Sequence, residues 1–240
     1  MRKLAILLFF ITFAWSANLP AQETDACKKC MRTNESVHFD DNDKCKECLY
    51  KVYDELALDF GELAKKELYC GCSWVYKPNG KYNIRFNRNG CFESADPDDG
   101  VSLEHIVPKD FFNQKISFSN DLHNLYPAIL IVNRARQTKF FAEGSNGKIK
   151  YGICKTSMDA GSVYPRDEAK GMIARAYLYM VLIKQAIPTN EIDQDDIKMF
   201  KEWDKEYPPD PIERKRNAII EKVQGWPNPC ISFYPSCSSE

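Results

Sequence analysis

Residues 101–137 read VSLEHIVPKDFFNQKISFSNDLHNLYPAILIVNRARQ. Two of the chain's three histidines, His105 and His123, lie in this stretch. A first strand carries His105, and Pro108 predicts that this strand ends shortly after the histidine. His123 lies in a second alternating pattern, and Pro127 fits the first position of the helix that follows. The stretch therefore predicts two strands and then a helix, with a histidine on each strand.

The spacing also says which side chains can meet. On an ideal strand Glu104 and His105 would point to opposite faces, so both reach one site only if the strand ends or is irregular there. In the predicted helix, Arg136 lies one turn beyond Asn133 on the same face. Strand, strand and helix, with histidine on the first strand and asparagine on the helix, is the layout of a ββα-metal finger.

These residue types suit the hydrolysis of a phosphodiester bond. The reaction needs a base for water, positive charge on the phosphoryl oxygens and a stabilised leaving alkoxide. His105 suits the base, because the unperturbed pKa of histidine is about 6.5. Oxygens of Glu104 and Asn133 suit Mg²⁺, which takes few protein ligands and keeps waters. Ca²⁺ and Mn²⁺ are the alternative ions.

Five motifs resemble the bacterial endonuclease I family of periplasmic and secreted nucleases. They are YCGC (69–72), LEHIVPKDFF (103–112), DLHNLYPAILIVNRAR (121–136), KYGICKT (150–156) and GMIARAYLYM (171–180). The resemblance covers roughly residues 49–235. It implies a ββα-metal core, also called a His-Me finger, within an α+β, mainly helical fold. It further implies cleavage of DNA, and often RNA, without sequence specificity and with 5′-phosphate products.

The resemblance also implies roles for single residues. His105 matches the family's general base, and Glu104 and Asn133 match its Mg²⁺ ligands. His123 and Asn124 are expected to support the site through hydrogen bonds from behind the metal ligands. Longer family members carry a phosphate-contacting arginine in an insertion between the two strands, and this chain has only a short segment there, without arginine.

Arg136 is therefore the predicted contact to the scissile phosphate. The alternative is that Arg136 makes a structural ion pair. In that case Lys109, Lys115, Arg134 and Arg175 are the remaining candidates for the phosphate contact.

The N-terminus predicts export. Residues 1–21 read as a signal peptide, with Arg2 and Lys3 ahead of an apolar run of twelve residues, Leu4 to Trp15, that is too short to span a bilayer. After cleavage we expect a monomer, without membrane attachment, in the periplasm or the medium. The formal net charge of −1 falls to −3 without the two basic residues, so any basic groove must be local.

Ten cysteines in an exported chain predict disulfides. They are Cys27, Cys30, Cys45, Cys48, Cys70, Cys72, Cys91, Cys154, Cys230 and Cys237. The first four form two CxxC pairs in helical patterns, which two cross-linking disulfides would join as a hairpin. Zinc binding and a redox role are the alternatives for these pairs. The next four are expected to form two disulfides of unreadable connectivity, and the last two to pair with each other.

Three units are predicted: the signal peptide 1–21, a Cys-rich segment 22–48 and a nuclease domain 49–240. Within the last, helical patterns cover 49–68, 166–186 and 191–206. A further helix is marked by its ends, with Asp210 as N-cap, Pro211 at the first position and Gly225 as the stop.

The predicted function is an exported, Mg²⁺-dependent endonuclease that acts on DNA, with RNA as a candidate second substrate. The alternative is a non-catalytic protein that binds nucleic acid or a partner on a nuclease scaffold, with a zinc-binding module formed by the two CxxC pairs. Intact Glu104, His105 and Asn133 favour the enzyme.

Overall fold

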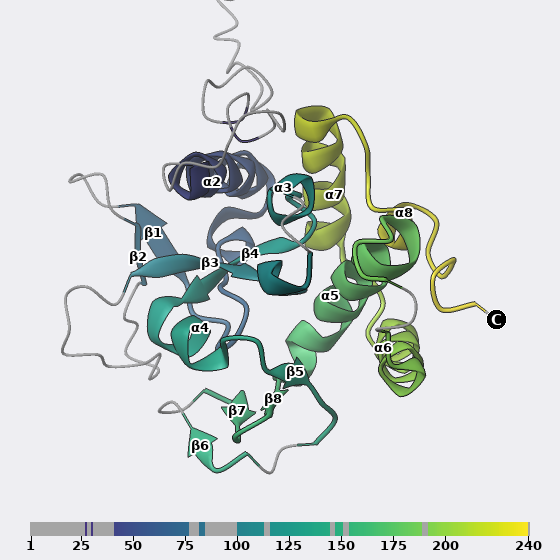
Figure 1. Cartoon of the computed structure of the whole chain (residues 1–240). Helices are drawn as coiled ribbons and strands as arrows, with labels where there is room; N and C mark the ends of the chain where they lie inside the picture. The colour runs from purple at the N-terminus through teal and green to yellow at the C-terminus, as the bar shows by residue number, and fades with distance from the viewer. Residues whose placement is uncertain are drawn as a thin grey trace, which may run out of the picture.

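The computed structural model describes residues 27, 30, 41–76, 82–84, 100–112, 116–144, 147–150, 154–188 and 192–239. The predicted signal peptide, Cys91 and Lys115 lie outside these residues. The elements, drawn in Figure 1, are α2 (Asp41–Phe60), η2 (Gly61–Ala64), β1 (Trp74–Tyr76), β2 (Tyr82–Ile84), β3 (Val101–His105), η3 (Lys109–Phe112), α3 (Ile116–Ser119), β4 (Leu125–Ile129), α4 (Leu130–Arg136), β5 (Phe140–Phe141), β6 (Ile149–Lys150), β7 (Ser157–Met158), β8 (Ser162–Tyr164), α5 (Asp167–Leu178), the π-helix η4 (Tyr179–Ile183), α6 (Gln194–Glu206), α7 (Pro211–Gln224) and α8 (Pro229–Ser232).

Helices α2, α5, α6 and α7 surround the short β3–β4 pair on several sides, with α2 against α7 and α5 against α6 (Figure 1). The ends of α7 are those that the sequence predicted. Asp210 accepts a hydrogen bond from the Glu213 backbone N–H at 2.7 Å, Pro211 is the first helical residue, and Gly225 ends the helix at a φ of 92°. That left-handed conformation favours glycine.

Helices α5 and α6 approach each other closely. A Cβ atom on Gly171 of α5 would lie only 2.2 Å from the Tyr207 carbonyl oxygen at the end of α6. The buried Arg175 guanidinium of α5 joins this helix to two others, because it binds Asp204 of α6 at 2.9 Å and Glu213 of α7 at 2.5 Å. One helix was predicted over residues 166–186. In the structure this segment forms α5 and then continues directly as the π-helix η4.

Strands β3 and β4 are antiparallel, and α4 follows β4 directly. The order strand, strand, helix is as predicted, but the second strand lies further along the chain. Residues 121–124 form a turn, in which the Asp121 side chain accepts from the His123 N–H and the Asp121 carbonyl accepts from the Asn124 N–H. These local bonds replace a strand ladder.

The prediction that Pro127 begins the helix is wrong. Pro127 lies inside β4 opposite Leu103, and α4 begins at Leu130. A proline is tolerated there because β4 pairs with a strand on one side only. Its carbonyl oxygen instead accepts from the Leu68 N–H at 2.9 Å.

Two smaller sheets complete the fold. Strands β1 and β2 form an antiparallel pair, and residues 77–81 between them lie outside the described residues. The other sheet has the order β5-β8-β7-β6. In it, β8 pairs with β5 on one side and with β7 on the other.

Helix α2 begins before the predicted domain boundary and runs through residues 48 and 49. It ends at Phe60 because Gly61 takes a φ of 58°, so this glycine stops the helix rather than kinking it. Disulfides Cys27–Cys48 and Cys30–Cys45 cross-link the two CxxC pairs in antiparallel order. These four sulfurs are thus paired with one another, and not arranged as the thiolates of the alternative zinc module.

Two further disulfides join Cys70 to Cys154 and Cys230 to Cys237. Cys72 is also disulfide-bonded. No helix in the described part of the chain is both long and apolar enough to cross a bilayer.

Candidate active site

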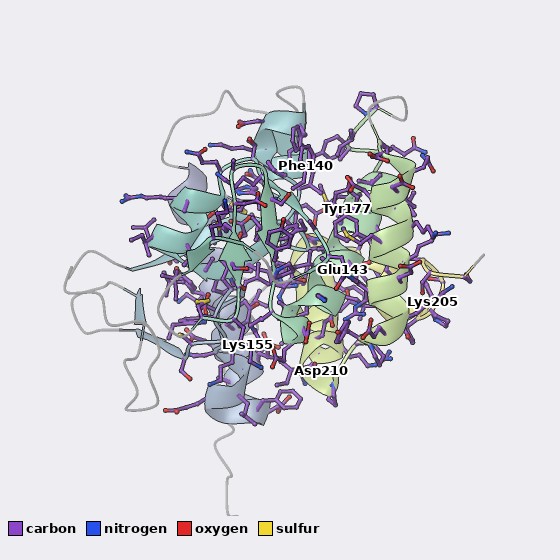
Figure 2. All side chains as sticks on the ribbon, turned by 90° about the horizontal axis from the view of Figure 1, so that it is seen from below. Phe140, Glu143, Lys155, Tyr177, Lys205 and Asp210 are labelled. Atoms are coloured by element: carbon purple, nitrogen blue, oxygen red, sulfur yellow. A yellow bond between two sulfur atoms is a disulfide. The ribbon has the colours of Figure 1, made fainter. Side chains whose placement is uncertain are left out.

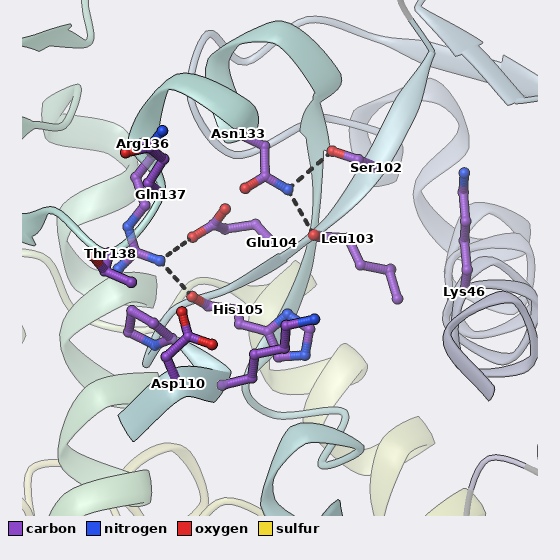
Figure 3. Close-up of a pocket in the computed structure, with 12 residues that line it drawn as sticks. Lys46, Ser102, Leu103, Glu104, His105, Asp110, Asn133, Arg136, Gln137 and Thr138 are labelled. Atoms are coloured by element: carbon purple, nitrogen blue, oxygen red, sulfur yellow. Dashed lines mark hydrogen bonds and ion pairs between the residues drawn. The ribbon is translucent and has the colours of Figure 1, made fainter. Parts of the chain in front are cut away.

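A cavity of about 470 Å³ lies where β3 ends (Figure 3). The predicted base, both predicted metal ligands and the predicted phosphate contact line it together. The full lining consists of Lys46, Ser102, Leu103, Glu104, His105, Pro108, Lys109, Asp110, Asn133, Arg136, Gln137 and Thr138. Strand β3 supplies Ser102, Leu103, Glu104 and His105. Lys109 and Asp110 come from η3, Asn133 and Arg136 from α4, and Lys46 from α2.

Glu104 and His105 reach the same cavity although they are neighbours on β3. Strand β3 ends at His105, where it pairs with Leu125, and the next two residues, Ile106 and Val107, form a bend. The strict alternation of a strand therefore no longer applies at this point. This is the strand end that the sequence required.

Asn133 is held in one orientation. Its amide nitrogen donates to the Leu103 carbonyl at 2.6 Å and to the Ser102 hydroxyl at 3.0 Å. Figure 3 shows the amide oxygen turned to the side of Glu104. Because both acceptors belong to β3, the two bonds fix the asparagine oxygen relative to the glutamate.

Glu104 is a buried carboxylate with one ionic partner. Its Oε1 accepts from Arg136 Nη1 at 2.6 Å, and the residue is 1% exposed. Burial raises the pKa of Glu104 to about 7, against the opposing effect of Arg136. A bound divalent cation would favour the ionised form.

The donor set fits a hard cation. The cavity offers the Glu104 carboxylate and the Asn133 amide oxygen, and the Asp110 carboxylate also lines it. No group of three or more His, Cys, Asp or Glu side chains that could hold a metal ion is found among the described residues. Two oxygen ligands with room for water suit Mg²⁺.

His105 has the form that a general base needs. Its Nε2 lies 3.0 Å from the Ser119 carbonyl oxygen, which only accepts, so Nε2 carries the proton and Nδ1 keeps its lone pair. Burial lowers the pKa of His105 to about 4. The imidazole is therefore neutral at neutral pH.

Arg136 corresponds to the alternative that the sequence left open, the structural ion pair. Its guanidinium is buried and bonds Glu104, the carbonyls of His105 and Ile106, and the Lys139 carbonyl. Four of its five N–H groups are thus engaged by the protein. These bonds favour the ion-pair alternative, because in the structure Arg136 holds the Glu104 carboxylate. The predicted phosphate contact of Arg136 stays a prediction.

The structure shows which of the other candidate cations line the cavity. Arg175 is 1% exposed and bound to two carboxylates, which removes it from the surface. Arg134 is exposed on α4 but does not line the cavity. Lys109 lines the cavity and is exposed. Lys115 lies outside the described residues.

Lys46 is a cavity residue that the sequence reading missed. It lies on α2, on the opposite side of β3 from Arg136 (Figure 3). Its position between Cys45 and Cys48 gave no sign of proximity to His105, because only the fold brings α2 to the end of β3.

His123 and Asn124 lie behind the cavity and do not line it. The Asn124 side chain accepts from the Val107 N–H at 2.9 Å and donates to the Val107 carbonyl at 3.0 Å. These two bonds hold the segment after His105 against the turn that carries Asn124. His123 points to the helical layer, where Nε2 donates to the Trp226 carbonyl and the ring packs against Tyr179. Its support of the site is therefore indirect.

The chain is similar in sequence to known nucleases. The family described as Endonuclease I matches residues 44–233. An extracellular deoxyribonuclease of Aeromonas hydrophila is 39% identical over 68% of this chain and 80% of its own length. An Endonuclease-1 of Buchnera aphidicola subsp. Acyrthosiphon pisum (strain APS) is 30% identical, covering 68% and 72%. An extracellular ribonuclease of Bacillus subtilis (strain 168) is 34% identical, covering 57% and 52%.

Proposed function

The chain belongs to the endonuclease I family, and from that premise we propose that it is an exported, monomeric, Mg²⁺-dependent endonuclease. It hydrolyses phosphodiester bonds of DNA, and also of RNA, to 5′-phosphate products. The observation that carries the proposal is the meeting of Glu104, His105 and Asn133 in one cavity. The names of the Aeromonas and Bacillus relatives support export and both substrates.

The proposed catalytic core is a ββα-metal finger made of β3, β4 and α4. Support comes from the antiparallel pairing of the strands, the direct passage from β4 into α4, and the two hydrogen bonds from Asn133 to β3. These contacts place the residue on the helix against the residues on the first strand.

In the proposed reaction, His105 Nδ1 takes a proton from water, and the water oxygen attacks phosphorus. The bond from phosphorus to the 3′-oxygen breaks, so the phosphate remains on the 5′ side. Glu104 and Asn133 would hold Mg²⁺, which would supply positive charge to the phosphoryl oxygens and the leaving 3′-oxygen. The 3′-oxygen takes a proton from water as it leaves. Arg136 keeps the Glu104 carboxylate in place. Because phosphate contacts carry no sequence information, sequence preference should be weak.

A plasmid-nicking assay with the oxidised, full-length protein tests this function. We expect cleavage with Mg²⁺ and none with chelator. Protons and metal compete for Glu104, whose pKa without metal is about 7. Activity at low Mg²⁺ should therefore fall as the pH drops through about 7. Saturating Mg²⁺ should move the fall to lower pH, toward the value of about 4 where His105 becomes protonated.

Cleavage that survives complete chelation would contradict metal dependence. If the fall of activity at low pH does not shift with Mg²⁺ concentration, Glu104 is not a metal ligand. Binding of DNA without any nicking, at every divalent ion tested, would favour the alternative of a non-catalytic binding protein.

Lys109 is the proposed phosphate contact. Its removal should weaken binding to all sequences alike and flatten the log–log salt dependence by about one unit, as expected for one lost ionic contact. We expect Lys109→Ala to raise KM on duplex and single strands without changing which sequences are cut. The measurement is initial rate against substrate concentration at several salt concentrations.

Arg134→Ala is the matched control, because Arg134 is an exposed cation on α4 that does not line the cavity. It should leave the salt slope close to that of the unchanged protein. If Lys109→Ala and Arg134→Ala give equal slopes, Lys109 makes no phosphate contact, and Lys46→Ala is then the variant that should change the slope.

A further inference from the structure

A second cavity, of about 410 Å³, adjoins the catalytic one and shares Pro108 and Arg136 with it. Five aromatic side chains line it: Phe111, Phe140, Phe141, Tyr177 and Phe200. We propose that this cavity binds an unpaired nucleobase of the strand that is being cut. The proposal rests on the proposed nuclease function and names the substrate form that the site prefers, a single strand.

One wall of the cavity is a fixed aromatic platform. Strand β5 pairs with β8 through Phe140 and Ser162, and the alternation of a strand turns Phe141 inward and Phe140 outward. Phe140 is 54% exposed, whereas Phe141 is 4% exposed. The Phe111 ring stacks on Phe140 with ring centres 5.8 Å apart and an angle of 14° between planes. A base can stack on such a surface.

The other wall belongs to the helices. Tyr177 of α5 and Phe200 of α6 stack with ring centres 4.1 Å apart. Figure 2 views this side of the molecule, with Phe140 and Tyr177 labelled near α6. Because both residues line the cavity, the space lies between aromatic surfaces from two different parts of the chain.

The negative charges in the second cavity favour binding of a base over binding of a phosphate. Asp193 and Asp196 line the side formed by α6, and their carboxylates repel the phosphate backbone. Carboxylate oxygens accept hydrogen bonds from the amino groups of cytosine and adenine. Of the two cations in the lining, Arg136 is held by Glu104 and by carbonyls, and Lys139 Nζ donates to the Ala135 carbonyl at 2.8 Å.

The turn η3 connects the two cavities. It carries Lys109 and Asp110 into the catalytic cavity and Phe111 into the aromatic one. A strand whose phosphate lies at His105 therefore has a neighbouring base beside the platform. In a duplex that base is paired and stacked, and extruding it costs a few kcal/mol. A single strand has no such cost.

The test uses oligodeoxycytidine in which one internal nucleotide lacks its base. Base–aromatic stacking is sequence-tolerant, so every bond of the normal strand should be cut similarly. We expect the unchanged protein to cut one of the two bonds next to the abasic position about tenfold more slowly than the other bonds, equivalent to about 1.4 kcal/mol. Gel analysis of the products measures all bonds in one reaction.

Phe140→Ala supplies the second arm. It should cut normal single strands about tenfold more slowly, cut duplex DNA with little change, and lose the distinction between normal and abasic positions. Phe233→Ala is the matched control, because Phe233 is 69% exposed and lies on the C-terminal segment. It should behave as the unchanged protein does. Thermal melts of all three proteins check that they are folded.

Equal cutting at abasic and normal positions by the unchanged protein would overturn the base-binding proposal while leaving the nuclease intact. If the protein cuts nothing, the nuclease proposal fails separately. Fluorescence anisotropy with labelled oligodeoxycytidine then still tests whether the aromatic cavity binds a base. Phe140→Ala should bind the oligonucleotide about tenfold more weakly than the unchanged protein. Equal binding by both proteins would reject the base-binding proposal.

Discussion

His105→Ala is expected to cut DNA about 10²- to 10⁴-fold more slowly than the unchanged protein, the usual contribution of a positioned general base. Its Mg²⁺ affinity should stay the same, because the proposed metal ligands are Glu104 and Asn133. The loss should appear in kcat as well as in kcat/KM, since proton transfer occurs only in the transition state. Single-turnover cleavage and calorimetric Mg²⁺ titration measure the two effects.

His123→Gln is the matched control, since it replaces the other histidine of the same stretch. His123 is buried against Tyr179 and bonded to the Trp226 carbonyl, so this variant should lose thermal stability and keep its specific activity while folded. A His105→Ala protein with normal kcat would remove His105 from the reaction. A His105→Ala protein that also loses Mg²⁺ binding would make the histidine a metal ligand instead of the base.

Replacing Cys70 and Cys154 by serine is expected to cause the largest loss of stability among the disulfides described. This bridge spans 84 residues of sequence. By the loop-entropy relation it contributes about 4–5 kcal/mol, against a typical total stability of about 5–15 kcal/mol. We expect a fall in the denaturation midpoint large enough to leave much of the variant unfolded, measured by urea titration and circular dichroism.

The bridge also holds the turn that packs behind the catalytic strands. The buried Glu67 side chain accepts from the backbone N–H groups of Cys70 and Cys72, and the Leu68 N–H donates to Pro127 in β4. Activity should therefore be lost together with the fold. Strong reductant should have the same effect on the unchanged protein.

The Cys230–Cys237 bridge is the internal comparison, because it closes only seven residues and the same relation gives about 2 kcal/mol. Its double serine variant should lose about half as much stability. Equal losses in the two double variants would mean that loop length does not set the effect. Full activity and unchanged melting after complete reduction would refute the dependence on disulfides altogether.

Local signals in the sequence determined several features. The caps of α7 are set by contacts within one turn, between Asp210 and Glu213, and by the left-handed conformation at Gly225. The proposed catalytic set was also readable, because the motifs that carry Glu104, His105 and Asn133 resemble those of a known nuclease family. Export was likewise predicted from composition, through the apolar N-terminus and the ten cysteines, and it stays a prediction because residues 1–21 lie outside the described part.

Other features were decided by contacts between distant residues. Pro127 was expected to begin a helix, but pairing with Leu103 keeps it in a strand. The role of Arg136 depended on a carboxylate thirty-two residues away, Glu104, and on three backbone carbonyls that no local pattern reveals. Cysteine pairing depended in the same way on which segments the fold brings together.

The boundary between the two kinds of information follows from the range of the interactions. The sequence by itself determined the caps of α7, the strand–strand–helix order and the candidate base and metal ligands, because each rests on neighbours within a few turns or one hairpin. Only the tertiary structure decided that Lys46 reaches the catalytic cavity and that Phe111, Phe140, Tyr177 and Phe200 enclose a second one. Those side chains come from η3, β5, α5 and α6, and burial of the shared core is what brings these elements together.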